Sequence, residues 1–191
     1  MIPKYFSGRQ GLPFALGFAL ALTPQLFAAD ALLTGDTFIS TSNAAGNFGS
    51  NPSLGVGGGS TTVMQFSLSP LPPALQAVNI SKAVLRLYVN RVTVAGNVSV
   101  AALNSALTEN TATQANFAGA VGSTIAGPFP LAAAGTFLSV DVTTQVQNAL
   151  LGGTVGFAVT GDGTVVAQFD SKENTGTSQA PRLDEARPHF E

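Results

Sequence analysis

Residues 83–90 read AVLRLYVN, and apolar and polar side chains alternate along this stretch. In an extended chain, Arg86, Tyr88 and Asn90 point to one side. The aliphatic side chains between and before them point to the other side, namely Leu85, Leu87 and Val89. A period of two is typical of a β-strand with one buried face and one solvent-facing face.

The same alternation recurs in short segments that are separated by Gly, Pro, Ser and Asn. We therefore predict further strands at residues 37–40, 64–68, 98–100, 138–142, 157–159 and 165–169. The last two flank Gly161-Asp162-Gly163, a sequence that favours a turn, so we expect them to form a hairpin.

Other segments lack this alternation. Residues 43–59 contain Gly57-Gly58-Gly59 and are expected to form a loop. Residues 101–134 are weakly patterned and are expected to form long loops with one strand at most. From Thr143 or Thr144 to Leu151 the apolar period becomes helical, which predicts the only helix of the chain.

Seven or eight strands, one short helix and no βαβ rhythm indicate an all-β fold. We predict a jelly-roll β-sandwich of two antiparallel sheets. A mature chain of this length is expected to form a single domain that spans residues 29–191, with its core in residues 36–183.

The first 28 residues have the layout of a secretory signal peptide. Lys4 and Arg9 precede the uncharged apolar run 14–22, which is too short to span a membrane, and cleavage is expected after Ala28. The alternative is a retained amphiphilic anchor. We expect a secreted, extracellular protein, and the periplasm and the cell surface are the alternative locations.

The charge balance limits the partners that the protein can have. Without Lys4 and Arg9, six basic residues stand against ten acidic ones, a net charge of −4, and no basic cluster offsets it. Such a surface repels nucleic acid. The absence of cysteine excludes disulfides, thiolate metal sites and cysteine nucleophiles.

Several short motifs occur in the order and spacing of one known family. They are Asp36-Thr37-Phe38-Ile39, Asn47-Phe48-Gly49, Leu54-Gly55-Val56-Gly57, residues 66–72, residues 80–89, residues 109–113, Val140-Asp141-Val142-Thr143, Gly156-Phe157-Ala158-Val159, Ser171-Lys172-Glu173-Asn174 and Pro181-Arg182-Leu183. In this the chain resembles the DNRLRE domain, which is also classed as carbohydrate-binding module family 96. The resemblance implies a secreted jelly-roll module of a kind often attached to polysaccharide-degrading enzymes or surface proteins. Some members of the family bind acidic polysaccharides such as alginate.

Arg86, Tyr88, Asn90 and Lys172 are the candidate ligand-binding residues. Sugar binding uses flat rings for stacking against C–H groups and planar polar groups for hydroxyls or carboxylates. Arg86 and Tyr88 offer both on one strand face. The alternative is a solvated strand face with one amphipathic tyrosine.

Asp170, Glu173 and Asn174 lie within five residues, and together with Asp36 they form the candidate metal site. Calcium takes six to eight oxygen ligands of this kind, so a structural calcium ion is the one cofactor that we consider. In the alternative, Glu173 and Asn174 bond loop backbone and Lys172 pairs with a carboxylate.

We predict no enzymatic activity. Glycoside hydrolysis needs two facing carboxylates, and the spacing of the available ones does not show that any two converge. They are Asp36, Glu109, Asp141, Asp170 and Glu173. The single histidine, His189, lies two residues from the end, which argues against a Ser-His-Asp relay and a histidine-ligated zinc site.

Two functions remain. The first is a secreted, non-catalytic carbohydrate-binding module for an extracellular polysaccharide, an anionic one in particular. The second is a structural or adhesive protein of the cell envelope or matrix that assembles with itself or an envelope partner, because a low charge and small residues favour lateral packing.

Overall fold

The computed structural model describes residues 30–73 and 75–186, so the proposed signal peptide and His189 lie outside the described residues. Ten strands dominate this part of the chain, and every pairing between them is antiparallel. The strands are β1 (Leu32–Ser40), β2 (Ser53–Gly57), β3 (Ser60–Ser67), β4 (Lys82–Val94), β5 (Gly96–Leu103), β6 (Val121–Leu131), β7 (Thr136–Asp141), β8 (Thr154–Gly161), β9 (Val166–Asp170) and β10 (Arg182–Ala186). Two short helices are present, α1 (Gln114–Phe117) and α2 (Thr143–Ala149).

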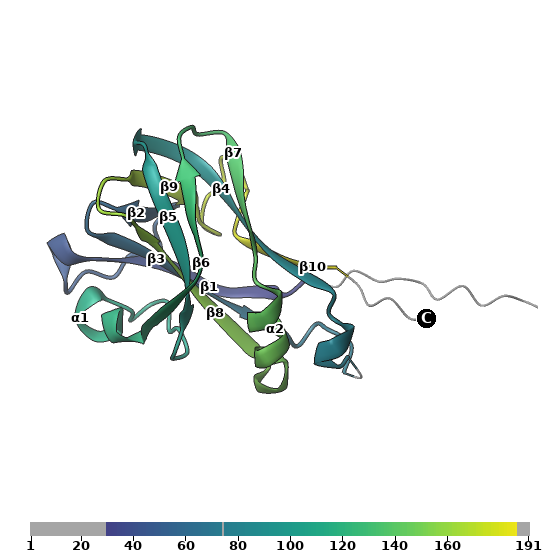
Figure 1. The fold of residues 1–191 in the computed structure, drawn as a ribbon. Helices are drawn as coiled ribbons and strands as arrows, with labels where there is room; N and C mark the ends of the chain where they lie inside the picture. Colours follow the sequence, from purple (N-terminus) through teal and green to yellow (C-terminus); the bar gives the residue numbers. More distant parts are fainter. Residues whose placement is uncertain (1–29, 74, 187–191) are drawn as a thin grey trace, which may run out of the picture.

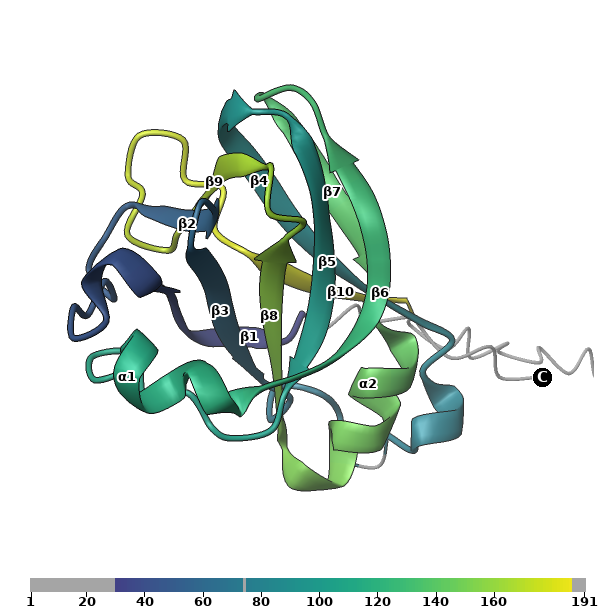
Figure 2. The same cartoon turned by 60° about the vertical axis from the view of Figure 1, so that its left-hand side comes forward.

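The strands form one continuous sheet that folds over on itself into two packed layers (Figures 1 and 2). The first layer has the order β1-β3-β8-β5-β6. In the second layer β4 pairs with β7, β10 and β9, and β9 pairs with β2. The layers join at the β2–β3 hairpin, where only Gly57 and Ser60 pair. The predicted all-β jelly-roll sandwich is confirmed.

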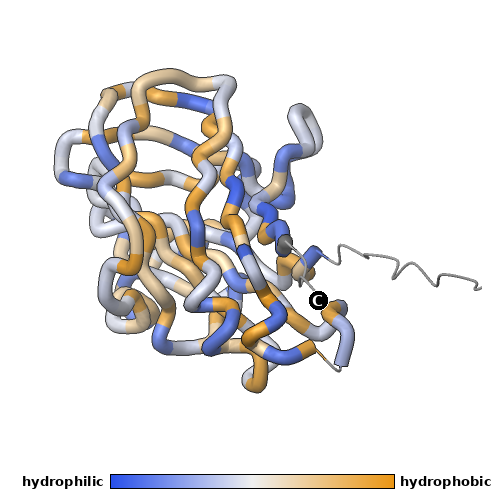
Figure 3. Tube along the Cα trace, turned by 45° about the vertical axis from the view of Figure 1, so that its right-hand side comes forward, coloured by the Kyte–Doolittle hydropathy of each residue, from blue (hydrophilic) through white to orange (hydrophobic). Residues whose placement is uncertain are grey.

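The main hydrophobic core lies between the two layers. Leu85, Leu87 and Val89 of β4 are fully buried there, as the alternation in the sequence predicts. The first layer contributes Met64, Phe66, Phe157 and Val159 from the opposite side, among others. Figure 3 shows the corresponding change between hydrophobic and hydrophilic residues along the strands.

A second, smaller core lies on the outer face of the first layer. Ile39, Val63 and Ala158 project there from β1, β3 and β8, and the segment that carries α1 covers them with Phe117. Thr113 caps α1 by accepting a hydrogen bond from the Asn116 amide. This covering segment also carries Glu109, so its packing fixes the position of a charged residue.

Helix α2 contacts β4 of one layer and β8 of the other, and its Val146 is fully buried in the main core. The helix thus closes one end of the sandwich, where it also appears in Figure 2. Neither α1 nor α2, nor any other helix among the described residues, has the length and apolar character needed to cross a membrane.

Three local predictions are wrong. The segment 43–59, expected to be a loop, contains β2, because glycines at alternate positions hid the pattern of Leu54 and Val56. Helix α2 is not the only helix, since α1 forms within 101–134 beside the strand β6. Strands β8 and β9 do not pair with each other: β8 pairs with β3 and β5, whereas β9 pairs with β4 and β2.

The turn at Asp162 explains why β8 and β9, which flank it, belong to different layers. The Asp162 carboxylate accepts hydrogen bonds from the amides of Thr164, Val165 and Asn97 at 3.0, 3.1 and 2.8 Å. These bonds direct the chain across the seam between the layers instead of back along β8. The predicted turn is therefore present and held by hydrogen bonds, but it connects strands of two layers and does not form a hairpin.

Gly57 at this seam tolerates no side chain. It has φ +72°, and a Cβ there would lie 1.9 Å from the carbonyl oxygen of Val165. Only glycine therefore allows β2, β3 and the β8–β9 connection to approach one another this closely.

We expect Gly57→Ala to lower the free energy of unfolding by at least about 2 kcal/mol more than Gly163→Ala does. Gly163 also has a positive φ, +87°, but no atom lies within 4 Å of the position of its Cβ, so this control isolates the backbone strain. Urea denaturation of both variants measures the difference. Equal losses in the two variants would show that the seam relaxes easily.

Candidate functional site

The outer face of the second layer presents one row of polar and aromatic side chains. Arg86 of β4 is in register with Arg182 of β10 and Ser139 of β7, and Tyr88 is in register with Phe137. All five side chains project away from the core, because their neighbours in sequence are the buried ones. We call Arg86, Tyr88, Phe137, Ser139 and Arg182 the outer platform.

Aromatic and guanidinium groups contact one another in the outer platform. The Arg86 Cζ lies 4.8 Å from the ring centroid of Phe137. The Tyr88 ring meets that of Phe137 edge to face, with centroids 5.2 Å apart. The Phe137 residue is 43% exposed, although apolar residues of this size usually bury more of their surface. The platform thus combines apolar ring surface with hydrogen-bond donors.

The guanidinium of Arg86 has one acidic neighbour, Asp184 of β10. The Arg86 Nη1 to Asp184 Oδ2 distance is 3.5 Å, and the two side chains are 44% and 37% exposed. An exposed pair at this distance contributes little to stability. Arg86 therefore remains available for a second anionic or hydroxyl group.

Asn90 lies on the same strand face but has another role. Its Nδ2 donates to Asp170 Oδ1 at 2.8 Å and to Ser53 Oγ at 3.0 Å. Asn174 Nδ2 donates to the same Asp170 oxygen, and the Thr177 hydroxyl contacts the other one. The Asn90 side chain thus links β4 to β2 and β9, and Asp170 in turn holds the 171–178 loop.

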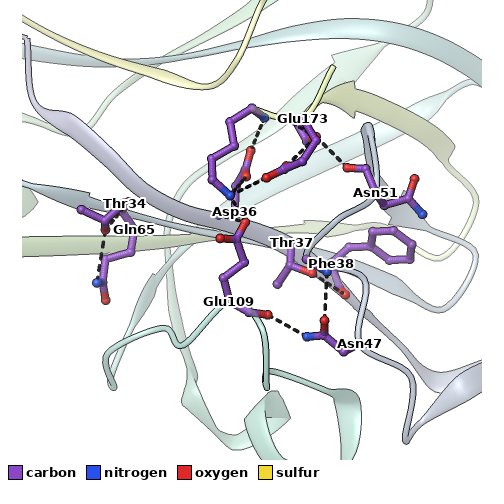
Figure 4. Close-up of polar contacts among 12 residues, drawn as sticks. Thr34, Asp36, Thr37, Phe38, Asn47, Asn51, Gln65, Glu109 and Glu173 are labelled. Atoms are coloured by element: carbon purple, nitrogen blue, oxygen red, sulfur yellow. Dashed lines mark hydrogen bonds and ion pairs between the residues drawn. The ribbon is translucent and has the colours of Figure 1, made fainter. Parts of the chain in front are cut away.

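Lys172, the fourth candidate ligand residue, lies apart from the outer platform among three carboxylates. Its Nζ is 2.6 Å from Glu173 Oε1 and 3.6 Å from Asp36 Oδ1, and it also contacts Glu109 Oε1. Figure 4 shows the three acidic side chains pointing toward one another. We call these four residues the Lys172 cluster.

The Lys172 cluster joins segments that are distant in sequence. Asp36 comes from β1, Glu109 from the segment before α1, and Glu173 from the loop after β9. The amide of Lys172 donates to Asp36 Oδ2 at 3.0 Å, and the amide of Asp36 donates to Glu109 Oε1 at 3.2 Å. Each contact fixes one loop against β1.

The 43–52 loop completes this arrangement. The Asn47 amide group donates to the carbonyl oxygens of Glu109 and Ala112 at 2.7 and 2.9 Å, and the Ser171 hydroxyl donates to the Asn51 carbonyl at 2.6 Å (Figure 4). A Cβ at Gly49 would lie 2.8 Å from Glu109 Cγ, so glycine permits the close packing. Four of the sequence motifs therefore meet at one place.

Burial dominates the electrostatics of the Lys172 cluster. Asp36 is fully buried, and its Oδ1 accepts no hydrogen bond. Burial, with the charges of Glu173 and Glu109, raises the pKa of Asp36 to about 7, although the Lys172 amide and ammonium lower it. Burial alone would lower the pKa of Lys172, but its carboxylate partners outweigh burial and raise that pKa.

The metal-ligand set expected from the sequence is divided between two places. Asp36 and Glu173 lie together with Glu109, with one oxygen of each within 4.8 Å of the others, so these three could hold a cation. Asp170 and Asn174 bond each other elsewhere, and Asn174 also accepts from the amides of Gly176 and Thr177. Lys172 already supplies a positive charge to the three carboxylates. Calcium binding stays a prediction.

Phe137 and Glu109 belong to these two clusters but were not among the site residues predicted from the sequence. Phe137 alternates with the buried Leu138 and Val140, so its outward direction was readable from the sequence. Its position beside Tyr88 was not readable, because the β4–β7 register joins residues far apart in the chain. Glu109 belonged to one of the motifs, but nothing in the sequence placed it near Asp36.

A model of carbohydrate-binding module family 96 matches residues 28–183. This range covers every described strand except the last residues of β10. No curated protein matches the chain.

We expect the free energy of unfolding to fall as the pH rises from about 4 to about 7. In the folded protein the pKa values of Asp36 and Glu185 are about 7, in both cases chiefly because of burial. The folded state therefore keeps protons that the unfolded chain has released in this window, and the stability that they provide is lost as these groups ionise. At about 1.4 kcal/mol per pKa unit, the decrease should reach about 2 kcal/mol or more.

Urea denaturation between pH 4 and pH 8 measures this dependence, and Asp36→Asn should flatten it. Asp141 and Asp162 do not obscure the window, because hydrogen bonds, first of all from Thr143 and Thr164 respectively, lower their pKa values below it. Stability that rises over the same range would contradict the assignment of Asp36 and Glu185.

Lys172→Met should destabilise the protein at pH 8 by about 2 kcal/mol or more, because it leaves three carboxylates without their cation. The loss should be smaller at pH 5, where Asp36 is protonated. Lys82→Met is the matched control, since Lys82 is exposed on β4 and its loss changes the net charge equally. Equal losses from the two variants would show that the Lys172 cluster does not stabilise the fold.

Proposed function

Because the chain belongs to carbohydrate-binding module family 96, we propose that it is a secreted, non-catalytic module that binds an extracellular, anionic polysaccharide through the outer platform. Modules of this kind are carbohydrate-binding proteins and are typically not catalysts. The N-terminal pattern of residues 1–28 supports secretion.

The contact of Arg86 with the exposed ring of Phe137, beside Tyr88, carries this proposal. The C–H faces of a pyranose ring pack against aromatic surface, and a guanidinium binds carboxylates or adjacent hydroxyls with paired hydrogen bonds. Rigid β-strands hold all of these groups, so little conformational freedom is lost on binding.

The distribution of charge supports an anionic ligand. The described residues include five basic side chains, and three of them lie on the outer face of β4 and β10. These three are Lys82, Arg86 and Arg182. Asp184 of β10 and Asp141 of β7 lie on the same face and offset two of these three charges. The single long contact of Asp184 to Arg86 is easily exchanged for a ligand carboxylate.

The flat form of the platform sets the strength of binding. A ligand on an open sheet face stays largely in contact with water, so each sugar contributes little. A polymer contacts the platform with several residues and can rebind after partial release. The proposal therefore concerns a polysaccharide and not a free monosaccharide.

Affinity electrophoresis in gels that contain alginate or polygalacturonate tests the proposal. We expect Arg86→Ala and Phe137→Ala each to weaken retention about fivefold, since a charge-assisted hydrogen bond or a stacking contact is lost. Added salt should weaken retention of the unmodified protein, because the ligand is bound partly through charge.

Arg91→Ala and Leu151→Ala serve as matched controls, since both residues are exposed but lie outside the platform. Light scattering on the same samples separates ligand binding from self-association, the rival structural function. If Arg86→Ala and Phe137→Ala are retained as strongly as the unmodified protein, the outer platform is not the binding face. If the protein assembles but binds no polysaccharide, the structural function is favoured.

A further inference from the structure

A shallow pocket lies on the outer face of the first layer, away from the outer platform. Its volume is about 210 Å³. It is lined by Gln65 of β3, by Thr154 and Gly156 of β8, and by the 103–106 segment that leaves β5. Gln65 pairs with Gly156 in the β3–β8 ladder, so regular sheet geometry fixes the floor.

The polar groups of this pocket are uncharged. Gln65 and Asn104 supply amides, whereas Ser105 and Thr154 supply hydroxyls. No acidic or basic side chain belongs to the lining. A carboxylate or ammonium ligand would find no opposite charge in this lining, so the lining gives ions no preference over neutral ligands.

One of these groups is held in place and the others are free. Gln65 Oε1 accepts from the Leu107 amide at 2.8 Å, and its Nε2 lies 3.4 Å from the Thr34 hydroxyl, so the orientation of the amide is fixed. The side chains of Asn104, Ser105 and Thr154 form no hydrogen bond to another part of the described chain. Three groups therefore remain to bind a ligand.

Leu103 adds a small apolar surface to the otherwise polar pocket. A Cβ at Gly156 would lie 2.9 Å from Leu103 Cδ1, which shows how closely the leucine lies against the bare backbone of β8. A small apolar surface among amides and hydroxyls suits a pyranose, whose ring carries hydroxyls around its edge and C–H groups on its faces.

From this geometry we infer that the pocket is a second carbohydrate-binding site, which takes one uncharged sugar residue of a neutral polysaccharide. Its volume lies below the range of roughly 300–1,000 Å³ that is usual for drug-sized ligands, in keeping with a single ring. The inference rests on the proposed function, because membership of a carbohydrate-binding family makes sugar the relevant ligand class.

Affinity electrophoresis with two sets of gels tests the second site. The neutral set contains galactomannan, xyloglucan or hydroxyethylcellulose, and the acidic set contains alginate or polygalacturonate. We expect the double variant Asn104→Ala/Thr154→Val to weaken retention on a neutral gel about tenfold, through the loss of two hydrogen-bonding groups, without altering retention on acidic gels. Arg86→Ala should show the opposite pattern.

The matched control is Asn148→Ala/Thr124→Val, which makes the same two changes at exposed positions of α2 and β6. Thermal unfolding of both double variants should match that of the unmodified protein. Retention on acidic gels but on none of the neutral ones would overturn the second site and leave the proposed function intact. Retention on a neutral gel that the pocket variant does not reduce would overturn it equally.

Discussion

The structure depends on the alternation of side chains along β4. This strand pairs with β7, β9 and β10, so most of the second layer takes its register from it. Because the period is two, burying Leu85 and Leu87 forces Arg86 and Tyr88 to the outside. A shift of one residue would place a guanidinium in the core and empty the outer platform. Core and candidate binding face are thus two consequences of one register.

The loops at one edge of the sandwich are held by charge as well as by apolar packing. Three carboxylates meet around a single ammonium, and one of them, Asp36, is fully buried. Without that cation the three carboxylates would repel one another. The segments around residues 109 and 172 are bonded to β1 through Asp36, and the loop around residue 47 is bonded to the 109 segment. The chain has no cysteine, so no disulfide attaches these loops to the sheet. Attachment through ionisable groups makes the stability of this edge sensitive to pH.

The sequence predicted the strands whose alternation is formed by large side chains, as in β3, β4 and β8. It missed β2, where Gly55 lies between Leu54 and Val56 because Phe38 and Ser60 leave little room for a larger residue. It also gave the wrong partner for β9, since turn residues reveal that the chain bends but not toward which layer. Of the candidate ligand residues, Arg86 and Tyr88 lie together on the exposed face, whereas Asn90 and Lys172 bond other parts of the protein. The alternation of apolar and polar residues is a local property of the sequence. The contacts of Asn90 and Lys172 depend instead on strand register and loop packing, which join residues far apart in the chain.

Only 9% of the residues are charged, and the places where charge occurs are therefore informative. Lys172 compensates the carboxylates of its cluster, whereas Arg86 and Arg182 lie side by side on an open face. Adjacent like charges cost free energy in a sheet, and Asp184 near Arg86 offsets only part of that cost. The pocket beside Gln65 shows the opposite case, in which polar groups gather without any charge. In our proposal the outer platform, with its guanidinium groups and aromatic rings, and the uncharged pocket, with its amides and hydroxyls, bind different sugars. The difference between them follows from which side chains the β4 and β3 registers turn outward.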